Sequence, residues 1–206
     1  MDSVVYLRNR IRLMLICISL SLLGLSTLAY VCVNQKALMG QMQNQFVNYR
    51  DPIFGFEIQY PNDWEKIQFA QGITEGSHNM VVNFLSPQGG ASQIFREYLL
   101  IEVANVTSVS SNQSAFSRGE LNFLTQSFPH FLPIKINASS TLDGHKAYSV
   151  LFTYDDPIVG KGKAMTVWTL NGSKGYILSY HADSSNYNKY LPTIAKMINS
   201  FRIISK

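Results

Sequence analysis

A histidine and an aspartate two residues apart, His181 and Asp183, are the best-spaced pair for chemistry in this sequence. In a strand, residues i and i+2 lie on one face, so the carboxylate could orient the imidazole for metal binding or general base catalysis. His145 would have to converge on the pair to complete a hydrolytic or metal-dependent site. We adopt the alternative interpretation, a histidine and a carboxylate that stabilise the end of a strand, because two ligands do not make a closed site.

Two adjacent carboxylates form a second candidate metal site. Asp155 and Asp156 precede Pro157 and offer the hard oxygen ligands that Ca²⁺ prefers. A competent calcium loop assembles about six or more oxygens, so we interpret this pair as a turn with solvated charges. The run at residues 160–163, Gly-Lys-Gly-Lys, lacks the first Gly and the Ser/Thr of a phosphate-binding loop. The sequence therefore predicts no catalytic residue, no cofactor and a protein that is not an enzyme.

The distribution of charge argues against a nucleic-acid partner. The 206 residues include 17 Lys and Arg and 13 Asp and Glu, a formal net charge of +4. Most of the excess lies in residues 1–47, where four basic residues accompany a single aspartate, while the remainder holds 13 basic and 12 acidic residues. Phosphate backbones are bound by a basic stripe, and a nearly balanced domain does not supply one. We expect no nucleic-acid binding.

A hydrophobic segment near the N-terminus has the length of a membrane-spanning helix. Residues 13–33 contain no charged side chain, and at about 1.5 Å per residue they span the roughly 30 Å hydrocarbon core. The rival is a cleavable signal peptide, whose apolar region is about 7 to 15 residues long and for which Thr27-Leu28-Ala29 could be the cleavage site. The uninterrupted length favours a retained anchor, which makes the membrane itself a partner.

The charges that flank this segment predict its orientation. Three arginines within residues 1–12 precede it and Lys36 is the one basic residue close behind it. By the positive-inside rule, residues 1–12 are then cytoplasmic, a spacer occupies residues 34–47, and residues 48–206 form a domain outside the cell membrane. Four Asn-x-Ser/Thr sequons suit such an exported surface, and they begin at Asn105, Asn112, Asn137 and Asn171.

The two cysteines of the chain, Cys17 and Cys32, fall inside the predicted anchor. The domain beyond it therefore has no thiol. Disulfides, thiolate metal sites and cysteine nucleophiles are excluded for residues 48–206.

Alternation of apolar and polar residues predicts a strand-rich domain. Residues 54–60 are the clearest run, with aromatic and aliphatic side chains alternating with Gly, Glu and Gln before Pro61 ends the pattern. The last three strand candidates are joined by short connections, so they predict an antiparallel meander with Asn171-Gly172 as a hairpin turn. Further strands are expected at 80–85, 98–104, 134–138, 147–154, 164–170 and 176–182.

Two helices are expected among these strands. The first covers residues 117–128, with Ser117 and Glu120 as a capping box. The second begins after Ser184-Ser185, and its regular part is placed from about Tyr190, because Pro192 is tolerated in a first turn but breaks a helix interior. Helices at two separated points of a strand-rich chain predict an α+β domain, with a central, mainly antiparallel sheet flanked by helices in an α/β/α sandwich.

Both ends of the domain resemble one known family. Residues 54–64, Phe-Gly-Phe-Glu-Ile-Gln-Tyr-Pro-Asn-Asp-Trp, resemble the opening hairpin of the PsbP family, the extrinsic subunits of the oxygen-evolving photosystem, and of their PsbP-like relatives. Residues 187–192, Tyr-Asn-Lys-Tyr-Leu-Pro, and residues 197–203 are similar to the family's last helix and strand. The resemblance implies a sheet sandwiched by helices, usually without an active site, attached to larger membrane assemblies. It also implies Ca²⁺ or another divalent metal as a possible ligand.

The anchor and the resemblance together predict the protein's function. We expect a membrane-anchored, extracytoplasmic PsbP-like accessory module that binds a partner protein or a small ligand and assists a membrane complex. The anchor separates it from the photosystem subunits, which have a cleaved transit segment instead. The alternative is an extracytoplasmic hydrolase or metal-dependent enzyme that uses His181 and Asp183.

Overall fold

The computed structural model gives one compact unit from Phe46 onward. None of the helices among the described residues is long and apolar enough to cross a membrane. The predicted anchor at 13–33, the predicted cytoplasmic residues 1–12 and the spacer up to residue 44 lie outside that part of the chain. The structure describes residues 45–70, 74–75, 78–90, 95–106, 112–158 and 160–204.

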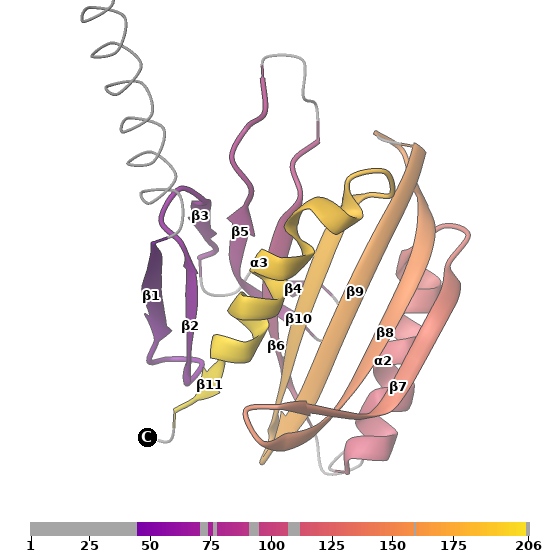
Figure 1. Ribbon diagram of the computed structural model, residues 1–206. Helices are drawn as coiled ribbons and strands as arrows, with labels where there is room; N and C mark the ends of the chain where they lie inside the picture. The colour runs from indigo at the N-terminus through magenta and orange to yellow at the C-terminus, as the bar shows by residue number, and fades with distance from the viewer. Residues whose placement is uncertain are drawn as a thin grey trace, which may run out of the picture. The chain divides into compact units, whose positions relative to one another are not determined.

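An eight-stranded antiparallel sheet forms the centre of this unit (Figure 1). Its order is β3-β5-β6-β10-β9-β8-β7, and β4 pairs with β5 off this path. The predicted mainly antiparallel sheet is confirmed. Its strands are β3 (Glu65–Gln68), β4 (Thr74–Glu75), β5 (His78–Leu85), β6 (Tyr98–Asn105), β7 (Leu132–Leu142), β8 (His145–Asp156), β9 (Gly160–Asn171) and β10 (Lys174–Asp183).

The meander of β8, β9 and β10 carries most of this sheet. Asn171 and Lys174 are paired in the β9–β10 ladder, and Gly172 between them has a φ of +61°. A glycine adopts this conformation without the steric cost that a Cβ would bring, so the predicted Asn171-Gly172 hairpin is confirmed. Strand β10 is buried along nearly its whole length because both faces of the sheet are covered there.

A second sheet of three strands, β1-β2-β11, brings the two ends of the domain together. Its strands are β1 (Phe46–Asp51), β2 (Phe56–Pro61) and β11 (Arg202–Ile203). Residues 54–64 do not form a hairpin by themselves, because the antiparallel partner of β2 is the preceding strand β1. The turn between these strands is held by Asp51, whose carboxylate accepts hydrogen bonds from the backbone N–H groups of Ile53 and Phe54, both at 2.9 Å.

Helix α2 (Gln113–Ser127) packs on one face of the large sheet, against β8 and β9 (Figure 1). It begins four residues before the predicted start. Asn112 is the N-cap, and its side chain accepts a hydrogen bond from the backbone N–H of Ala115 at 2.8 Å. The predicted capping box was wrong, because Ser117 and Glu120 are buried within the helix and face the sheet.

Helix α3 (Tyr187–Ser200) covers the other face together with the three-stranded sheet. It begins after Ser184-Ser185, as predicted, but it is regular three residues before the predicted Tyr190, so Pro192 lies inside the helix rather than in its first turn. The early start has a local cause: Tyr187 is buried, and its carbonyl oxygen accepts a hydrogen bond from the hydroxyl of Tyr180 at 2.9 Å.

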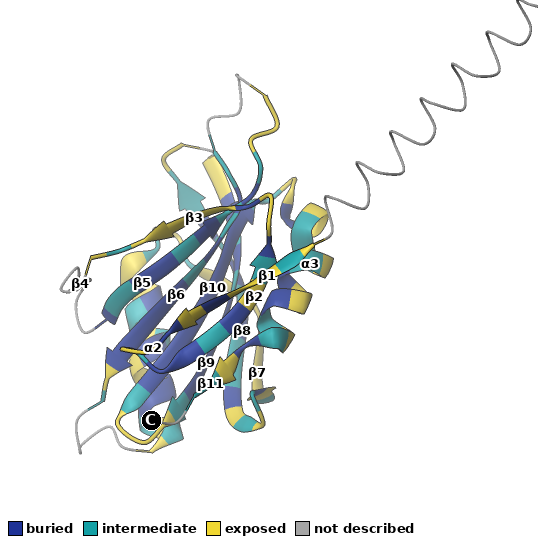
Figure 2. Ribbon diagram, turned by 90° about the vertical axis from the view of Figure 1, so that its left-hand side faces the viewer, coloured by how far each residue is buried: buried dark blue, intermediate teal, exposed yellow. Residues whose placement is uncertain are grey.

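Two hydrophobic cores lie on the two faces of the large sheet. The first fills the space under α3 and the small sheet, and includes Phe56, Ile58, Trp64, Phe84 and Phe201. Figure 2 shows that many residues of β5 and β6 are buried. Burying each such side chain contributes about 1.5–3 kcal/mol. The second core lies under α2 and includes Phe116, Leu124, Phe152, Trp168 and Ile177.

Candidate functional site

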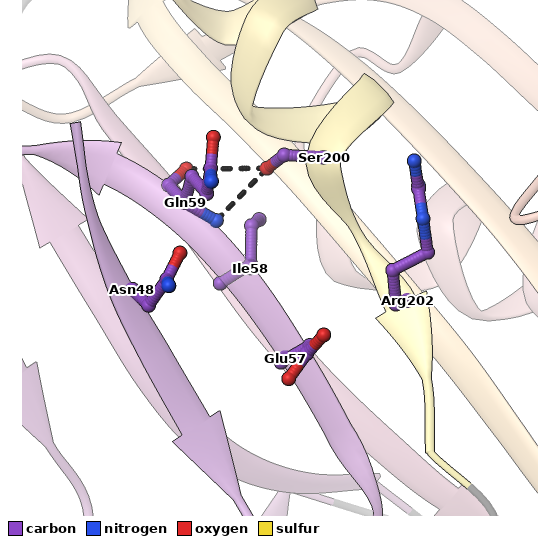
Figure 3. Close-up of a pocket in the computed structure, with 6 residues that line it drawn as sticks. All are labelled: Asn48, Glu57, Ile58, Gln59, Ser200 and Arg202. Atoms are coloured by element: carbon purple, nitrogen blue, oxygen red, sulfur yellow. Dashed lines mark hydrogen bonds between the residues drawn. The ribbon is translucent and has the colours of Figure 1, made fainter.

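A polar recess of about 310 Å³ opens where the two ends of the domain meet (Figure 3). It lies on the face of β2 that carries the side chains of Glu57 and Gln59, whereas the side chains of Phe56 and Ile58 are buried in the core. Four elements contribute to its lining. The lining residues are Asn48 of β1, Glu57, Ile58 and Gln59 of β2, Ser200 of α3, and Arg202 of β11.

The recess exists because β11 is too short to pair with the whole of β2. Arg202 pairs with Glu57, but the residue opposite Gln59 is Ser200, which still belongs to the end of α3. There the hydroxyl of Ser200 takes the place of a backbone acceptor of a neighbouring strand. It accepts a hydrogen bond from the Gln59 N–H at 2.8 Å and donates one to the carbonyl of Met197 at 2.6 Å. Figure 3 shows this contact beside the opening. The backbone N–H of Gln59 at the floor of the recess therefore already has a hydrogen-bond partner.

The charges around the recess are neutralised locally. Glu57 lies 4.0 Å from the guanidinium of Arg50. Arg202 donates to the carbonyls of Asn199 and Phe201, at 2.8 and 2.7 Å, and its Nε lies 3.6 Å from a carboxylate oxygen of Asp143. What remains is a neutral surface with amide and carboxylate groups that can donate and accept hydrogen bonds. Among the six lining residues, Glu57 is the one carboxylate, and a single carboxylate does not make a metal site.

His181 lies in the core under α2, enclosed by aromatic rings. Tyr98 and Phe128 stack on it with ring centroids at 4.9 and 5.3 Å, and its Nδ1 is 3.1 Å from the hydroxyl oxygen of Tyr154. Burial lowers the pKa of His181 to about 4, although the charge of Asp156 opposes the shift. The ring is therefore neutral near pH 7 and enclosed, which is the state of a core residue.

Asp183 takes part in a turn. One of its carboxylate oxygens accepts hydrogen bonds from both the N–H and the hydroxyl of Ser185, each at 2.8 Å, and this turn leads into α3. His145 is far from both. His181 pairs with Ala164 of β9, and Ala164 pairs with Phe152 of β8. Phe152 is seven residues from His145, which is roughly 23 Å along the strand at about 3.3 Å per residue. The three residues proposed for a hydrolytic or metal site do not converge.

Asp155 and Asp156 point to opposite faces of β8, as adjacent strand residues do. The carboxylate of Asp155 accepts hydrogen bonds from the Lys161 ammonium and from the His130 ring, and these bonds lower the pKa of Asp155. The carboxylate of Asp156 accepts the N–H of Ile158 at 2.8 Å. The two carboxylates therefore do not form one ligand set, and within the described ranges no group of three or more His, Cys, Asp or Glu is placed to hold a metal ion.

The four sequon asparagines all lie on the surface. Asn105 ends β6, Asn137 lies in β7, and Asn171 precedes the hairpin turn. Asn112 is the N-cap of α2. Glycosylation of these positions stays a prediction.

A buried charged cluster was missed by sequence reasoning. The ring of His78 lies between two carboxylates, with Nε2 at 3.1 Å from Glu120 and Nδ1 at 3.6 Å from Glu102, and all three side chains are buried. Phe123 packs on the ring at 4.4 Å. The carboxylates come from β6 and α2 and lie far from His78 in sequence, so no local motif could have revealed the cluster. Because they approach opposite nitrogens, they bracket the imidazole and do not share a metal.

Comparison with known proteins identifies the fold. No family model matches the sequence, and no curated protein matches it. Among solved structures, the cyanobacterial PsbP (CyanoP) of Synechocystis sp. PCC 6803 is similar, with a TM-score of 0.56 and 18% identity, covering 77% of this chain and 92% of that one. At this identity the likeness shows the fold alone, and the fold is PsbP-like.

Two further structures show how widely this fold is used. LpqN, which is involved in cell envelope biogenesis of Mycobacterium tuberculosis, has a TM-score of 0.50 and 14% identity over 79% of this chain and 93% of its own. The Ran-binding protein Mog1p of Saccharomyces cerevisiae has a TM-score of 0.50 and 7% identity over 78% of this chain and 96% of its own. The fold therefore occurs in proteins with different roles.

Proposed function

We propose that this chain is a membrane-anchored, extracytoplasmic accessory module that binds a protein partner through the recess and assists a larger membrane assembly. The observation that carries the proposal is the recess itself. It presents hydrogen-bond donors and acceptors on rigid elements, and its charges are compensated, so it can accept a polar side chain or a turn of a partner without burying an unpaired charge.

The similar structures support a binding role. LpqN is involved in cell envelope biogenesis and Mog1p is a Ran-binding protein, while CyanoP is a cyanobacterial PsbP. A fold that serves such roles elsewhere supports an accessory module here. The argument is one of analogy at the level of the fold.

The proposed location rests on the sequence. Residues 13–33 would anchor the chain with its N-terminus in the cytoplasm. The exposure of all four sequon asparagines supports a surface that can carry glycans.

In this proposal the chain is not an enzyme. His181 is the residue on which the catalytic alternative depends, and it is neutral, enclosed and hydrogen-bonded to Tyr154. A general base must reach the proton that it removes, which this ring cannot do without opening the core. These features support binding as the function.

Site-specific photo-crosslinking in native membranes tests the recess. A photo-crosslinking residue at Asn48, on the rim of the recess, is compared with one at Gln68, an exposed position of β3. We expect a discrete heteromeric product from position 48 that is absent from position 68. The product should weaken when Glu57→Lys reverses the charge beside the opening.

Two results would count against this proposal. Recovery of the uncrosslinked chain alone from both positions would show that no protein partner binds at the recess. Equal products from positions 48 and 68 would show random collision instead of recognition at the recess.

A further inference from the structure

The folded domain presents a more basic surface than its sequence indicates. Residues 48–206 hold 13 basic and 12 acidic residues. Four of the acidic side chains are buried, those of Asp51, Glu97, Glu102 and Glu120. None of the lysines and arginines whose burial the structure describes is buried. The charge that meets the solvent therefore has an excess of basic groups, although the domain as a whole is nearly balanced.

Four lysines each hold their ammonium group over an aromatic ring, within the range of a cation–π contact. The pairs, with the distance from Nζ to the ring centroid, are Lys66 over Tyr49 at 5.1 Å, Lys163 over Tyr187 at 4.5 Å, Lys189 over Tyr190 at 4.7 Å and Lys196 over Phe46 at 5.6 Å. Two of these rings belong to β1 and two to α3. All four rings pack on the core beneath α3 and the small sheet, so the lysines share one side of the large sheet. We call these four lysines the lysine face.

Helix α3 sets the spacing of two of these lysines. Lys189 and Lys196 are seven residues apart, which is about two helical turns, so they lie on the same side of the helix. Both are exposed, and α3 contains no acidic residue. Figure 2 shows exposed residues along α3. This helix therefore presents positive charge to the solvent without an internal counter-charge.

The surface carboxylates on this side of the sheet do not neutralise the lysine face. Three of them already pair with another cation: Glu57 with Arg50, Asp143 with Arg202, and Asp155 with Lys161. Asp63, and Asp183 in the turn before α3, form no ion pair with any residue that the structure describes, and neither do the four lysines. Four uncompensated cations therefore accompany two carboxylates, and the aromatic rings beneath the lysines leave their charge in place.

The predicted anchor keeps this face close to a membrane. Residues 34–45 separate the predicted anchor from Phe46, and twelve residues reach at most roughly 45 Å when fully extended. A short tether holds a binding surface near its target at an effective concentration in the millimolar range. The lysine face surrounds β1, the strand on which the tether ends. Weak contacts to the membrane surface are therefore sufficient for docking.

The chemistry of the lysine face fits phospholipid headgroups. Lysine is a flexible point charge that needs no fixed geometry in its partner, whereas arginine suits bidentate recognition, and all four cations are lysines. Near an anionic membrane each lysine contributes about fivefold to binding. A second copy of this chain is a poor occupant, because it presents the same positive charge.

We propose that the lysine face docks the domain on the anionic phospholipid headgroups of the membrane that anchors the chain. This inference rests on the anchor of the proposed function. Docking by this face brings the recess, which Ser200 of α3 borders, close to the bilayer. A partner in a membrane assembly would then meet the recess at the membrane surface.

Photo-crosslinking to lipid tests the inference on the full-length chain. A photo-crosslinking residue at Asn188, beside Lys189 on α3, is compared with one at Asn122 on α2; both positions are exposed, and the two helices cover opposite faces of the large sheet. The chain is reconstituted in nanodiscs of phosphatidylcholine, with and without phosphatidylglycerol. We expect a phospholipid adduct, identified by its mass, from position 188 in the anionic nanodiscs. Position 122 and neutral nanodiscs should give little adduct, and high salt should suppress it because screening weakens surface electrostatics.

Matched charge reversals assign the adduct to the lysine face. Lys189→Glu/Lys196→Glu should lower the adduct from position 188 by at least about fivefold. Arg118→Glu/Lys146→Glu makes the same change in net charge at exposed positions of α2 and β8 and should leave the adduct unchanged. The unfolding midpoints of both variants are compared with that of the unmodified chain. Equal losses in the two variants would show a dependence on net charge alone and would overturn the inference.

Four further outcomes would overturn it: no lipid adduct from position 188, equal adducts from positions 188 and 122, an adduct as strong in neutral nanodiscs, or a chain–chain adduct in its place. Failure of the chain to enter nanodiscs would overturn it together with the proposed anchor. A chain that enters nanodiscs but gives no lipid adduct leaves the proposed function intact, because crosslinking from Asn48 to a protein partner is measured separately.

Discussion

His78 and His181 lie on the same side of the main sheet, yet their surroundings shift their pKa values in opposite directions. Burial alone disfavours a charged ring and lowers the pKa of His78, but Glu102 and Glu120 outweigh it and raise that pKa to about 10. His181 is enclosed by aromatic rings and a tyrosine hydroxyl, and burial outweighs the opposing charge of Asp156 and lowers its pKa to about 4. One histidine is therefore charged in the folded state and the other neutral near pH 7.

The first prediction concerns alkaline pH. The folded-state pKa of His78 lies above its ordinary value of 6.5, so the folded state holds a proton that the unfolded state releases. The stability from this proton is fully present below about pH 6.5 and is lost as the pH rises through about 10. His78→Gln should flatten this part of the pH profile of the free energy of unfolding. Urea unfolding between pH 6 and pH 10 measures it, and parallel profiles for the two proteins would contradict it.

The second prediction concerns acid pH and has the opposite sign. The folded-state pKa of His181 lies below 6.5, so the unfolded state takes up a proton that the folded state refuses. The stability from the neutral ring is therefore present above about pH 6.5 and is lost as the pH falls toward about 4. His181→Gln should reduce the loss over this window relative to the unmodified chain, in the same urea measurement. An unchanged acid limb would show that carboxylates alone cause it.

At the scale of elements, helix α2 depends on a strand glycine. A Cβ placed on Gly175 of β10 would lie 2.1 Å from the ring of Phe116, which packs from α2. Gly175→Ala should therefore overpack this contact and lower the free energy of unfolding by about 1–3 kcal/mol. Chemical denaturation followed by far-UV circular dichroism would measure the change.

Gly119 provides the matched control within α2 itself. A Cβ there meets nothing within 4 Å, and alanine is the better helix former. Gly119→Ala should raise the free energy of unfolding by roughly 0.5–1 kcal/mol. A destabilised Gly119→Ala, or a neutral Gly175→Ala, would mean that the packing of α2 on β10 differs from the one described.

The same scale shows which elements the sequence could predict. The long central strands, such as β6 and β10, were predictable because apolar residues run almost continuously through them, as in strands that are buried on both faces. The short strands β3 and β4 were not, because two to four residues carry no recognisable period, and β11 was expected only from the resemblance of residues 197–203 to a family's last strand. The start of α2 was misplaced because Ser117 and Glu120 match a capping box locally, while their buried partners, Trp168 and His78, are distant in sequence.

The recess could not be predicted from sequence, and its cause belongs to the whole molecule. Asn48 and Gln59 meet Ser200 and Arg202 only because β11 returns to β2 across the full length of the domain. The metal and catalytic candidates were chosen by local spacing instead. Local spacing placed His181 and Asp183 correctly in one strand, but it could not reveal the aromatic enclosure around His181.

The predicted anchor leads to a test on the intact chain. If residues 13–33 span the membrane with the N-terminus inside, the chain should stay with membranes after carbonate extraction. Protease added to intact cells or right-side-out vesicles should then digest the domain, and deletion of residues 1–33 should release it from the membrane fraction. Protection of the domain from external protease would contradict the proposed orientation. Release of the chain by carbonate would contradict the predicted membrane anchor.

The last strand has a further consequence, for the order of events during synthesis. The β1-β2 hairpin is among the first parts of the domain to be made, but it packs on Phe201, whose ring stacks on Phe56 at 5.5 Å, and β2 gains its second neighbour from β11. A chain that ends at Ser200 should therefore be strongly destabilised, by about 3–5 kcal/mol for the lost aromatic side chain alone, whereas one that ends at Ile204 keeps β11. Thermal unfolding of the two truncated chains compares them.

Strand β11 follows all the other described strands along the chain, so the small sheet cannot close until residues 202–203 have been synthesised. In the proposed extracytoplasmic location, such a delay would keep the small sheet open until β11 has crossed the membrane.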